Sequence, residues 1–360
     1  MIRGCAGPRG CEFCGRKDAA TMPIDDVTDF ILERIQGSFS RAVDELPYDG
    51  REGGFQAWNI DSWDMIGEKL AIELPRDCSG RLYQALVDGI GDDQWCEFDW
   101  LALEPDESLR FSWNQFCEIT KHRRRFFFHD INRSTGYEPD RRSPLEFLTE
   151  VCNHAEGLGL IVDKPIGLTL YRARARQFRR PFRLAADLGP PPAEYATQSN
   201  RMNPPGIPMF YGADRRKLAL AEIRDSMASV GRFGTTRTIR IMDLASLPRV
   251  PGFFSTAPRI DRLVLRFLRA FAELIIQPVE RDNRVNVDYI PTQVFTEFLR
   301  DFDFEGGKID GLRYRSATGE RGTNYVLFAD QSAVADAVIP ESWETLDSWL
   351  RLTGVSQVNM

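Results

Sequence analysis

The segment Leu170-Tyr171-Arg172-Ala173-Arg174 marks the point where the chain changes from helical to strand-like patterning. Basic and apolar side chains alternate here, so Arg172 and Arg174 point to one face of a strand. Together with this segment, further short runs rich in Ile, Val, Tyr and Phe cover residues 168–173, 207–212, 236–243, 309–314, 323–328 and 334–339. Helical patterns lie between them at residues 214–229, 259–276 and 291–303. Residues 161–360 are therefore expected to form a mixed α/β domain.

Helical spacing of apolar residues dominates the part of the chain before this segment. Helices are expected at residues 24–46, 61–72, 79–90 and 110–128. Ser143, Pro144 and Glu146 are typical of a helix start, and Gly157-Leu158-Gly159 is typical of a helix end. The sequence predicts an α+β protein, with a mostly helical domain over residues 1–160 and a boundary near residue 160.

Length and charge limit the classes of partner. The 360 residues are enough for two domains with separate cores. The formal net charge of −7 gives no general attraction to nucleic acid or anionic membranes, so neither is expected as a partner. No apolar run approaches the length of a membrane span, and the start Met1-Ile2-Arg3-Gly4-Cys5 lacks the apolar core of a signal peptide. We expect a cytoplasmic protein.

Cysteine and histidine are confined to the first half of the chain. All seven Cys lie at or before Cys152, and all three His lie at or before His154. The α/β domain therefore has no Cys nucleophile, no His base and no Cys/His zinc site. If it is catalytic, its chemistry depends on carboxylates, hydroxyls, arginines and the backbone.

Several polar residues at strand ends and turns are candidates for a site. Arg172 could meet a phosphate through its planar donors, although a basic run is more often a solvated surface. The Pro-rich loop 188–206 contains Arg201-Met202-Asn203-Pro204-Pro205-Gly206, a turn that could project Arg201 and Asn203. Tyr211 follows in the next strand, where it packs in the core or faces a pocket.

Glu222 is the most informative acid. A helical Glu usually pairs with Lys or Arg one turn away, but its neighbours at that spacing are Leu218, Ala219, Asp225 and Ser226. It is therefore a site candidate, with Arg172 as an alternative long-range partner. Ser316 follows a predicted strand, and no downstream His can activate it, so a serine-hydrolase role is rejected. Its hydroxyl is better suited to position a ligand or the acid.

Four segments together resemble the RES domain, which is named for an arginine, a glutamate and a serine. They contain Arg172, then Arg201 with Asn203 and Tyr211, then Glu222, then Gly311-Leu312-Arg313-Tyr314-Arg315-Ser316, and the likeness covers about residues 165–340. The segment Tyr289-Ile290-Pro291-Thr292-Gln293 also looks like the family. The spacing from Glu222 to Ser316 is longer than in the family, which suggests an insertion around the helix at 259–276.

The resemblance implies a fold related to ADP-ribosyltransferases, a split β-structure that holds NAD⁺ between its halves. It also implies an NAD⁺-consuming toxin that cleaves the nicotinamide–ribose bond as a glycohydrolase, phosphorylase or ADP-ribosyltransferase. Glu222 would stabilise the oxocarbenium-like ribose, and Arg172 and Arg201 would hold the pyrophosphate. Tyr211 would line the nicotinamide side, Asn203 would take part in binding NAD⁺, and Ser316 would fix the sugar or Glu222. An antitoxin and a second copy of the chain are the expected protein partners, and a non-catalytic nucleotide-binding role is an alternative.

The first half of the chain carries two weaker signals. Cys5, Cys11 and Cys14 could bind a structural zinc, which needs a fourth ligand such as Cys78. The stretch from Trp113 to Phe128 resembles the HEPN-like domain found before some RES domains. Arg124 and His129 fit the loose spacing of HEPN ribonucleases, so ribonuclease activity is the second hypothesis. The run Phe126-Phe127-Phe128 instead indicates core packing.

Overall fold

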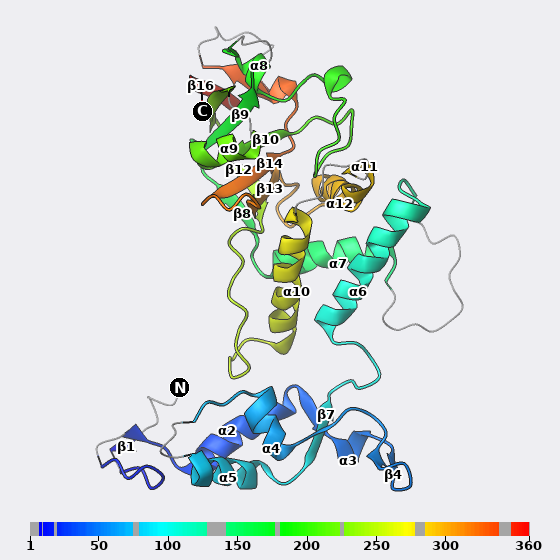
Figure 1. Ribbon diagram of the computed structural model, residues 1–360, viewed down its shortest axis with the longest axis vertical. Coiled ribbons are helices and arrows are strands. Elements are labelled where there is room, and N and C mark those ends of the chain that lie inside the picture. Colours follow the sequence, from blue (N-terminus) through cyan, green and yellow to red (C-terminus); the bar gives the residue numbers. More distant parts are fainter. Residues whose placement is uncertain are drawn as a thin grey trace. The chain divides into compact units, whose positions relative to one another are not determined.

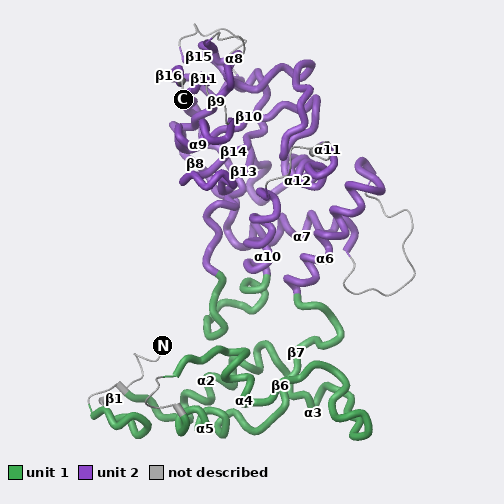
Figure 2. The backbone as a smooth tube through the Cα atoms, viewed as in Figure 1, with its two compact units in different colours: residues 1–104, 250–263 green, residues 105–249, 264–360 purple. Residues whose placement is uncertain are grey.

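A computed structural model of the chain describes residues 7–8, 10–17, 20–74, 79–127, 142–176, 181–223, 227–277, 285–337 and 347–359. Over these residues the protein is α+β, as predicted (Figure 1). It divides into two compact units, shown in Figure 2. Unit 1 holds residues 1–104 and 250–263, and unit 2 holds residues 105–249 and 264–360. None of the described helices combines the length and apolar character of a membrane span.

Unit 1 is a small helical body with short strands. Its helices are α2 (Ile24–Gln36), α3 (Ala42–Glu45), α4 (Ser62–Asp64), the π-turn η1 (Met65–Lys69) and α5 (Ser79–Ile90). Three strands form a sheet in the order β3 (Phe39–Arg41), β7 (Gln94–Glu97), β6 (Ile60–Asp61), and two hairpins pair β1 (Gly7–Pro8) with β2 (Ala20–Thr21) and β4 (Tyr48–Asp49) with β5 (Gly54–Phe55). The core contains Ile35, Met65 and Trp95, with Phe253 and Phe254 packed against it.

The single helix expected at residues 24–46 is wrong in its second half. The helix ends at Gln36, and Gly37 follows as its cap. Residues 39–41 then pair with β7 as strand β3, which places Phe39 in the core of unit 1. Pairing with a distant strand overrides the local helical spacing.

Four longer helices of unit 2 share one apolar core. They are α6 (Pro105–Glu118), α7 (Pro144–Gly157), α10 (Arg259–Ile276, whose first residues belong to unit 1) and α12 (Ile290–Asp301). The π-turn η2 (Ile119–Arg123) follows α6, and the short helix α11 (Val285–Asp288) precedes α12. Trp113 packs against Phe147 and edge-on against Phe271, and Phe271 packs edge-on against Phe295. Helices α6 and α7 precede residue 160 and yet belong to this core. The domain boundary near residue 160 stays a prediction.

The start of α7 follows the sequence prediction. Ser143 is its N-cap, Pro144 opens the helix, and Glu146 completes a capping box with the Ser143 backbone. This satisfies donors that the first turn would otherwise leave without partners. The helix ends at Gly157, and Gly159 takes a positive φ of 68° in the turn that follows.

A nine-stranded mixed sheet forms the rest of unit 2 in its described residues. The strand order is β15-β16-β11-β9-β10-β14-β13-β12-β8. The bounds are β8 (Ile161–Lys164), β9 (Thr169–Ala175), β10 (Phe210–Ala213), β11 (Met227–Thr235), β12 (Ile239–Asp243), β13 (Gly311–Arg315), β14 (Thr323–Leu327), β15 (Val334–Asp336) and β16 (Leu350–Asn359). Short helices α8 (Ala185–Leu188), η4 (Ala193–Tyr195), α9 (Arg216–Ile223) and η5 (Gln331–Ala333) lie between strands in the sequence.

The helix expected at residues 214–229 is too long. Helix α9 ends at Ile223, and Met227 begins β11, the strand that joins β9 to β16. Most of β11 is buried, so it lacks the polar alternation of a half-exposed strand. Strands β8 and β16 were also missed, whereas the helix expected at 259–276 matches α10.

Candidate functional site

The sheet of unit 2 opens between β9 and β10. These two strands share a single residue pair, Tyr171 with Ala213. Each strand pairs more extensively with its other neighbour: β9 pairs with β11 over seven residues, and β10 pairs with β14 over four. The backbones therefore diverge along residues 172–175, and a cavity of about 560 Å³ lies there. A cavity of this size is in the range of small-molecule sites.

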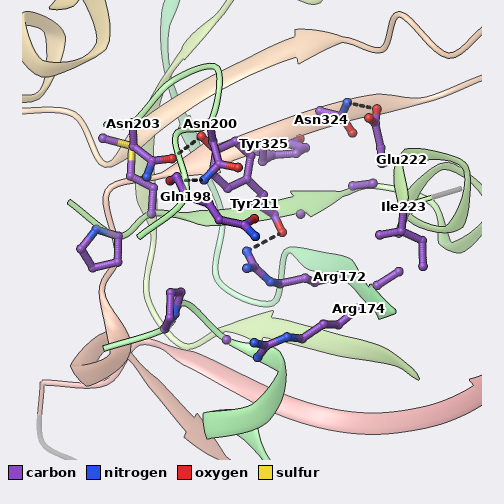
Figure 3. Close-up of a pocket in the computed structure, with 18 of the residues that line it drawn as sticks. Arg172, Arg174, Gln198, Asn200, Asn203, Tyr211, Glu222, Ile223, Asn324 and Tyr325 are labelled. Atoms are coloured by element: carbon purple, nitrogen blue, oxygen red, sulfur yellow. Dashed lines mark hydrogen bonds between the residues drawn. The ribbon is translucent and has the colours of Figure 1, made fainter. Parts of the chain in front are cut away.

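Strands β9, β10 and β14, helix α9 and the loop after α8 line the cavity (Figure 3). The charged lining residues in the described part of the chain are Arg172, Arg174 and Glu222. Uncharged polar and aromatic side chains supply much of the remainder: Tyr171, Tyr195, Thr197, Gln198, Asn200, Asn203, Tyr211, Tyr314, Asn324 and Tyr325.

Arg172 spans the gap between the two strands. Its Nη1 donates to the Tyr211 carbonyl at 3.3 Å, which gives this backbone acceptor a partner where the ladder is broken. The guanidinium lies over the Phe210 ring, 5.5 Å from the centroid. Within the described residues Arg172 forms no ion pair. Burial, with a smaller effect from Arg174, lowers the pKa of the guanidinium to about 10, so it stays charged at neutral pH.

A charged arginine in this setting is suited to bind an anion. A partly buried cation without a carboxylate partner among the described residues is costly, and a phosphate or pyrophosphate in the cavity would offset that cost through charge-assisted hydrogen bonds. Arg174 points to the same face of β9, where its Nη1 donates to the Asp187 carbonyl and its guanidinium stacks over Phe182.

Glu222 presents its carboxylate to the cavity from the last turn of α9. Its Oε1 accepts a hydrogen bond from Ser316 Oγ at 2.8 Å and another from Asn324 Nδ2 at 2.7 Å. No described residue forms an ion pair with it, so the alternative of a structural pair with Arg172 is not what the structure shows. Two neutral donors fix one carboxylate oxygen and leave Oε2 without a partner among the described residues.

Ser316 reaches Glu222 from the end of β13. Its hydroxyl also lies 2.9 Å from Thr318 Oγ1 and accepts from the Thr318 N–H, so the turn holds its position. Asn324 comes from the neighbouring strand β14 and is 8% exposed. Sequence reasoning did not find Asn324, because a lone Asn in a strand has no distinguishing pattern.

Asn203 and Tyr211 connect the loop at 196–207 to the sheet. The Tyr211 hydroxyl donates to Asn203 Oδ1 at 2.5 Å and accepts from the Met202 N–H at 3.3 Å. Asn203 is 2% exposed, and its Nδ2 donates to the Ile207 carbonyl at 2.8 Å. Burial raises the pKa of Tyr211 above its usual range, which keeps the hydroxyl neutral. Both side chains line the cavity, with their polar groups engaged by the loop.

Gln293 of α12 anchors the same loop from outside the cavity. Its Nε2 donates to Ser199 Oγ at 2.9 Å and to the Asn200 carbonyl at 2.7 Å. The family-like segment at 289–293 therefore acts on the loop that forms the cavity wall.

Arg201 faces away from the cavity. Its Nη1 donates to the Ile275 carbonyl at 3.0 Å at the end of α10, and its guanidinium lies over Tyr289, 5.3 Å from the ring centroid. The structure thus brings Arg172, Asn203, Tyr211 and Glu222 to one cavity, adds Ser316 through its bond to Glu222, and leaves Arg201 on the helical side of the loop.

The family of the chain follows from the comparisons. Residues 169–349 match the model of the RES domain, and residues 5–134 match HEPN/RES N-terminal domain 1. The RES match covers just over half of the chain. The chain therefore belongs to the RES domain family. The family resemblance predicted for both halves is confirmed, and membership is consistent with a toxin-like, NAD-related function. Searches of curated proteins and of solved structures gave no match.

The two signals of the first half are only partly described. Cys11 and Cys14 are free thiols in a turn closed by the Gly15 N–H and the Cys11 carbonyl. The described residues contain no group of three or more His, Cys, Asp or Glu placed to hold a metal, so they do not support zinc. Cys5 and Cys78 lie outside the described residues.

The expectation that Phe126 and Phe127 are core residues is wrong. They are 86% and 74% exposed, because the helical segment ends at Arg123 and Arg124 is extended. Trp113 and Phe116 fill the core instead. Phe128 and His129 lie outside the described residues, so a pairing of His129 with Arg124 stays a prediction.

Proposed function

We propose that the cavity of unit 2 binds NAD⁺ and cleaves its nicotinamide–ribose bond. The observation that carries this proposal is that one cavity contains both a fixed carboxylate and a guanidinium, each suited to a charge of opposite sign on the ligand. The Glu222 carboxylate is held by two neutral donors, and the Arg172 guanidinium lacks a carboxylate partner among the described residues. Such a pair suits a ligand with a developing positive charge at one point and an anionic group at another.

The chemistry of NAD⁺ fits these groups. When the bond between ribose C1′ and the nicotinamide nitrogen breaks, its electron pair returns to the ring and nicotinamide leaves as a neutral molecule. The departure needs no general acid. Positive charge grows on the ribose, and a fixed carboxylate stabilises it in the transition state. Glu222 supplies this carboxylate, and its Oε2 is available for the ribose hydroxyls.

The other residues take roles that follow from their contacts. Arg172 holds the pyrophosphate. Ser316 positions Glu222 rather than acting as a nucleophile. Tyr211 and Asn203 brace the wall of the site, and Arg201 acts on that wall through its contacts with α10 and Tyr289. An acceptor oxygen from water, phosphate or a macromolecule adds to C1′ and loses its proton, and the nature of the acceptor decides between hydrolysis, phosphorolysis and ADP-ribosyl transfer.

The test is the release of nicotinamide from NAD⁺ by the purified chain, measured by chromatography in parallel samples without acceptor, with phosphate and with a protein extract. We expect release in at least one sample, and the accompanying product identifies the acceptor. No release in any sample, together with cleavage of added RNA, would support the HEPN-type ribonuclease hypothesis. Neither activity would indicate a nucleotide-binding protein.

We also propose a toxin role, for which family membership is the support. Expression of the chain should arrest growth and deplete cellular NAD⁺. We also predict an antitoxin that restores growth. Self-association of the chain is a separate prediction.

A further inference from the structure

Tyr195 is an unusual member of the cavity wall. It lies at the end of η4 and lines the cavity, yet it is 72% exposed. The other tyrosines that line the cavity, at positions 171, 211, 314 and 325, are partly or largely buried. The backbone of Tyr195 is fixed, because its N–H donates to the Pro192 carbonyl at 2.9 Å and the next residue, Ala196, accepts from the Gly206 N–H at 2.8 Å. A rigid backbone thus presents an open aromatic ring.

Polar side chains near Tyr195 in the loop lie across the cavity from the acid. Figure 3 shows Gln198 and Asn200 on one side, Glu222 and Asn324 on the other, and Arg172 between the two groups. The side-chain amide of Gln198 has no hydrogen-bond partner among the described residues. This end of the cavity therefore combines an exposed ring with an unused donor and acceptor.

NAD⁺ consists of two base–ribose halves joined by a pyrophosphate. With the nicotinamide ribose at Glu222 and the pyrophosphate at Arg172, the second half extends toward the loop that carries Tyr195 and Gln198. Aromatic side chains bind nucleobases by stacking, and amides bind their edges. We propose that Tyr195 is the stacking platform for the adenine ring and that Gln198 contacts the adenine edge. This inference rests on the proposed function. It means that the loop determines the specificity of the site for a dinucleotide over a mononucleotide.

The proposal is tested with Tyr195→Ala and Tyr195→Phe, using NAD⁺ and nicotinamide mononucleotide as alternative substrates. Base stacking of this kind corresponds to about a tenfold or larger effect on affinity. Tyr195→Ala should raise KM for NAD⁺ by about tenfold or more with little change in kcat, and should leave kcat/KM for the mononucleotide unchanged. Tyr195→Phe should behave as wild type. Tyr48→Ala, at a 68% exposed tyrosine of unit 1, is the matched control.

Equilibrium binding of ADP, measured by calorimetry, separates this inference from the proposed function because it needs no turnover. If wild type binds ADP and Tyr195→Ala binds it about tenfold more weakly, the adenine subsite stands even where no nicotinamide is released. The inference is overturned if wild type does not bind ADP, if both proteins bind it equally, or if the variant loses activity on both substrates to the same degree.

Discussion

At the scale of single residues, the site depends on how Glu222 is held. Ser316 and Asn324 both donate to Oε1, from two neighbouring strands. Such bonds stabilise the ionised carboxylate and restrict its rotation. The acid and the serine could be predicted from the sequence through the family resemblance. Asn324 could not, because its role exists only when β13, β14 and α9 meet.

Asn324→Ala should therefore lower kcat by about tenfold or more, in line with the value of a hydrogen bond to a charged group, with a smaller effect on KM. Asn324→Asp should lower kcat at least as much, because it replaces a neutral donor to Glu222 with a second carboxylate that repels it. Steady-state kinetics and thermal unfolding check both variants. Loss of kcat that only follows a lowered melting temperature, with kcat per folded molecule at the wild-type value, would assign Asn324 a purely structural role.

Arg172 gives the site its own dependence on alkaline pH. Burial lowers its pKa from 12.5 to about 10, and the protonated form is the one that binds a pyrophosphate. Affinity for ADP should hold below pH 10 and fall as the pH rises through about 10, by up to tenfold per pH unit. Titrations from pH 8 to 11 measure this. An affinity for ADP that stays constant to pH 11 would show that binding of the pyrophosphate does not depend on Arg172.

At the scale of secondary-structure elements, the site exists because β9 and β10 are neighbours in the sheet but hardly pair with each other. Strands β9 and β10 share one residue pair, and the opening beside it forms the cavity. Strands β9, β10, β12, β13 and β14 could be placed from their apolar runs. The split itself could not, because register and divergence depend on strands far apart in the sequence. Strand β11 could not be placed because burial on both faces removes its alternation, and its first residues fell within the helix expected at 214–229.

Gly311 permits the close approach of β13 to β14. A Cβ at this position would lie 2.1 Å from the Val326 carbonyl oxygen, which belongs to backbone that cannot move aside. Gly311→Ala should therefore destabilise the protein by about 1–3 kcal/mol and displace Ser316 from Glu222. Gly157→Ala, where the new methyl meets open space, is the control. Thermal unfolding compares them, and equal melting temperatures would contradict the close-approach argument.

At the scale of the whole molecule, sequence composition and packing divide the chain differently. The composition changes near residue 160, and the two family matches end at 134 and begin at 169. In the structure, α6 and α7 already belong to the core of unit 2, where Trp113 contacts Phe271 and Phe147 contacts Phe267. The spacing of apolar residues predicts each helix separately, but it does not indicate which core the helix packs into.

Two fragments distinguish these boundaries. Residues 161–360 contain every proposed site residue but lose the aromatic side chains of α6 and α7, and truncating even one buried aromatic costs about 3–5 kcal/mol. We expect this fragment to be insoluble or unfolded and residues 105–360 to be folded and to release nicotinamide. Circular dichroism and the activity assay decide it. A stable, active 161–360 fragment would place the functional boundary near residue 160.

The central claim is that Glu222 is the catalytic carboxylate of an NAD⁺-cleaving site. The most direct measurement compares wild type with Glu222→Gln for nicotinamide release and for NAD⁺ binding, with Glu320→Gln, an exposed acid in the turn after Ser316, as control. The amide retains the shape but not the charge, so release should fall by about 10²–10³-fold or more while NAD⁺ binding, melting temperature and the control stay at wild-type values. Growth arrest on expression should disappear together with the activity. A Glu222→Gln variant that melts lower and still turns over NAD⁺ at the wild-type rate per folded molecule would contradict the account.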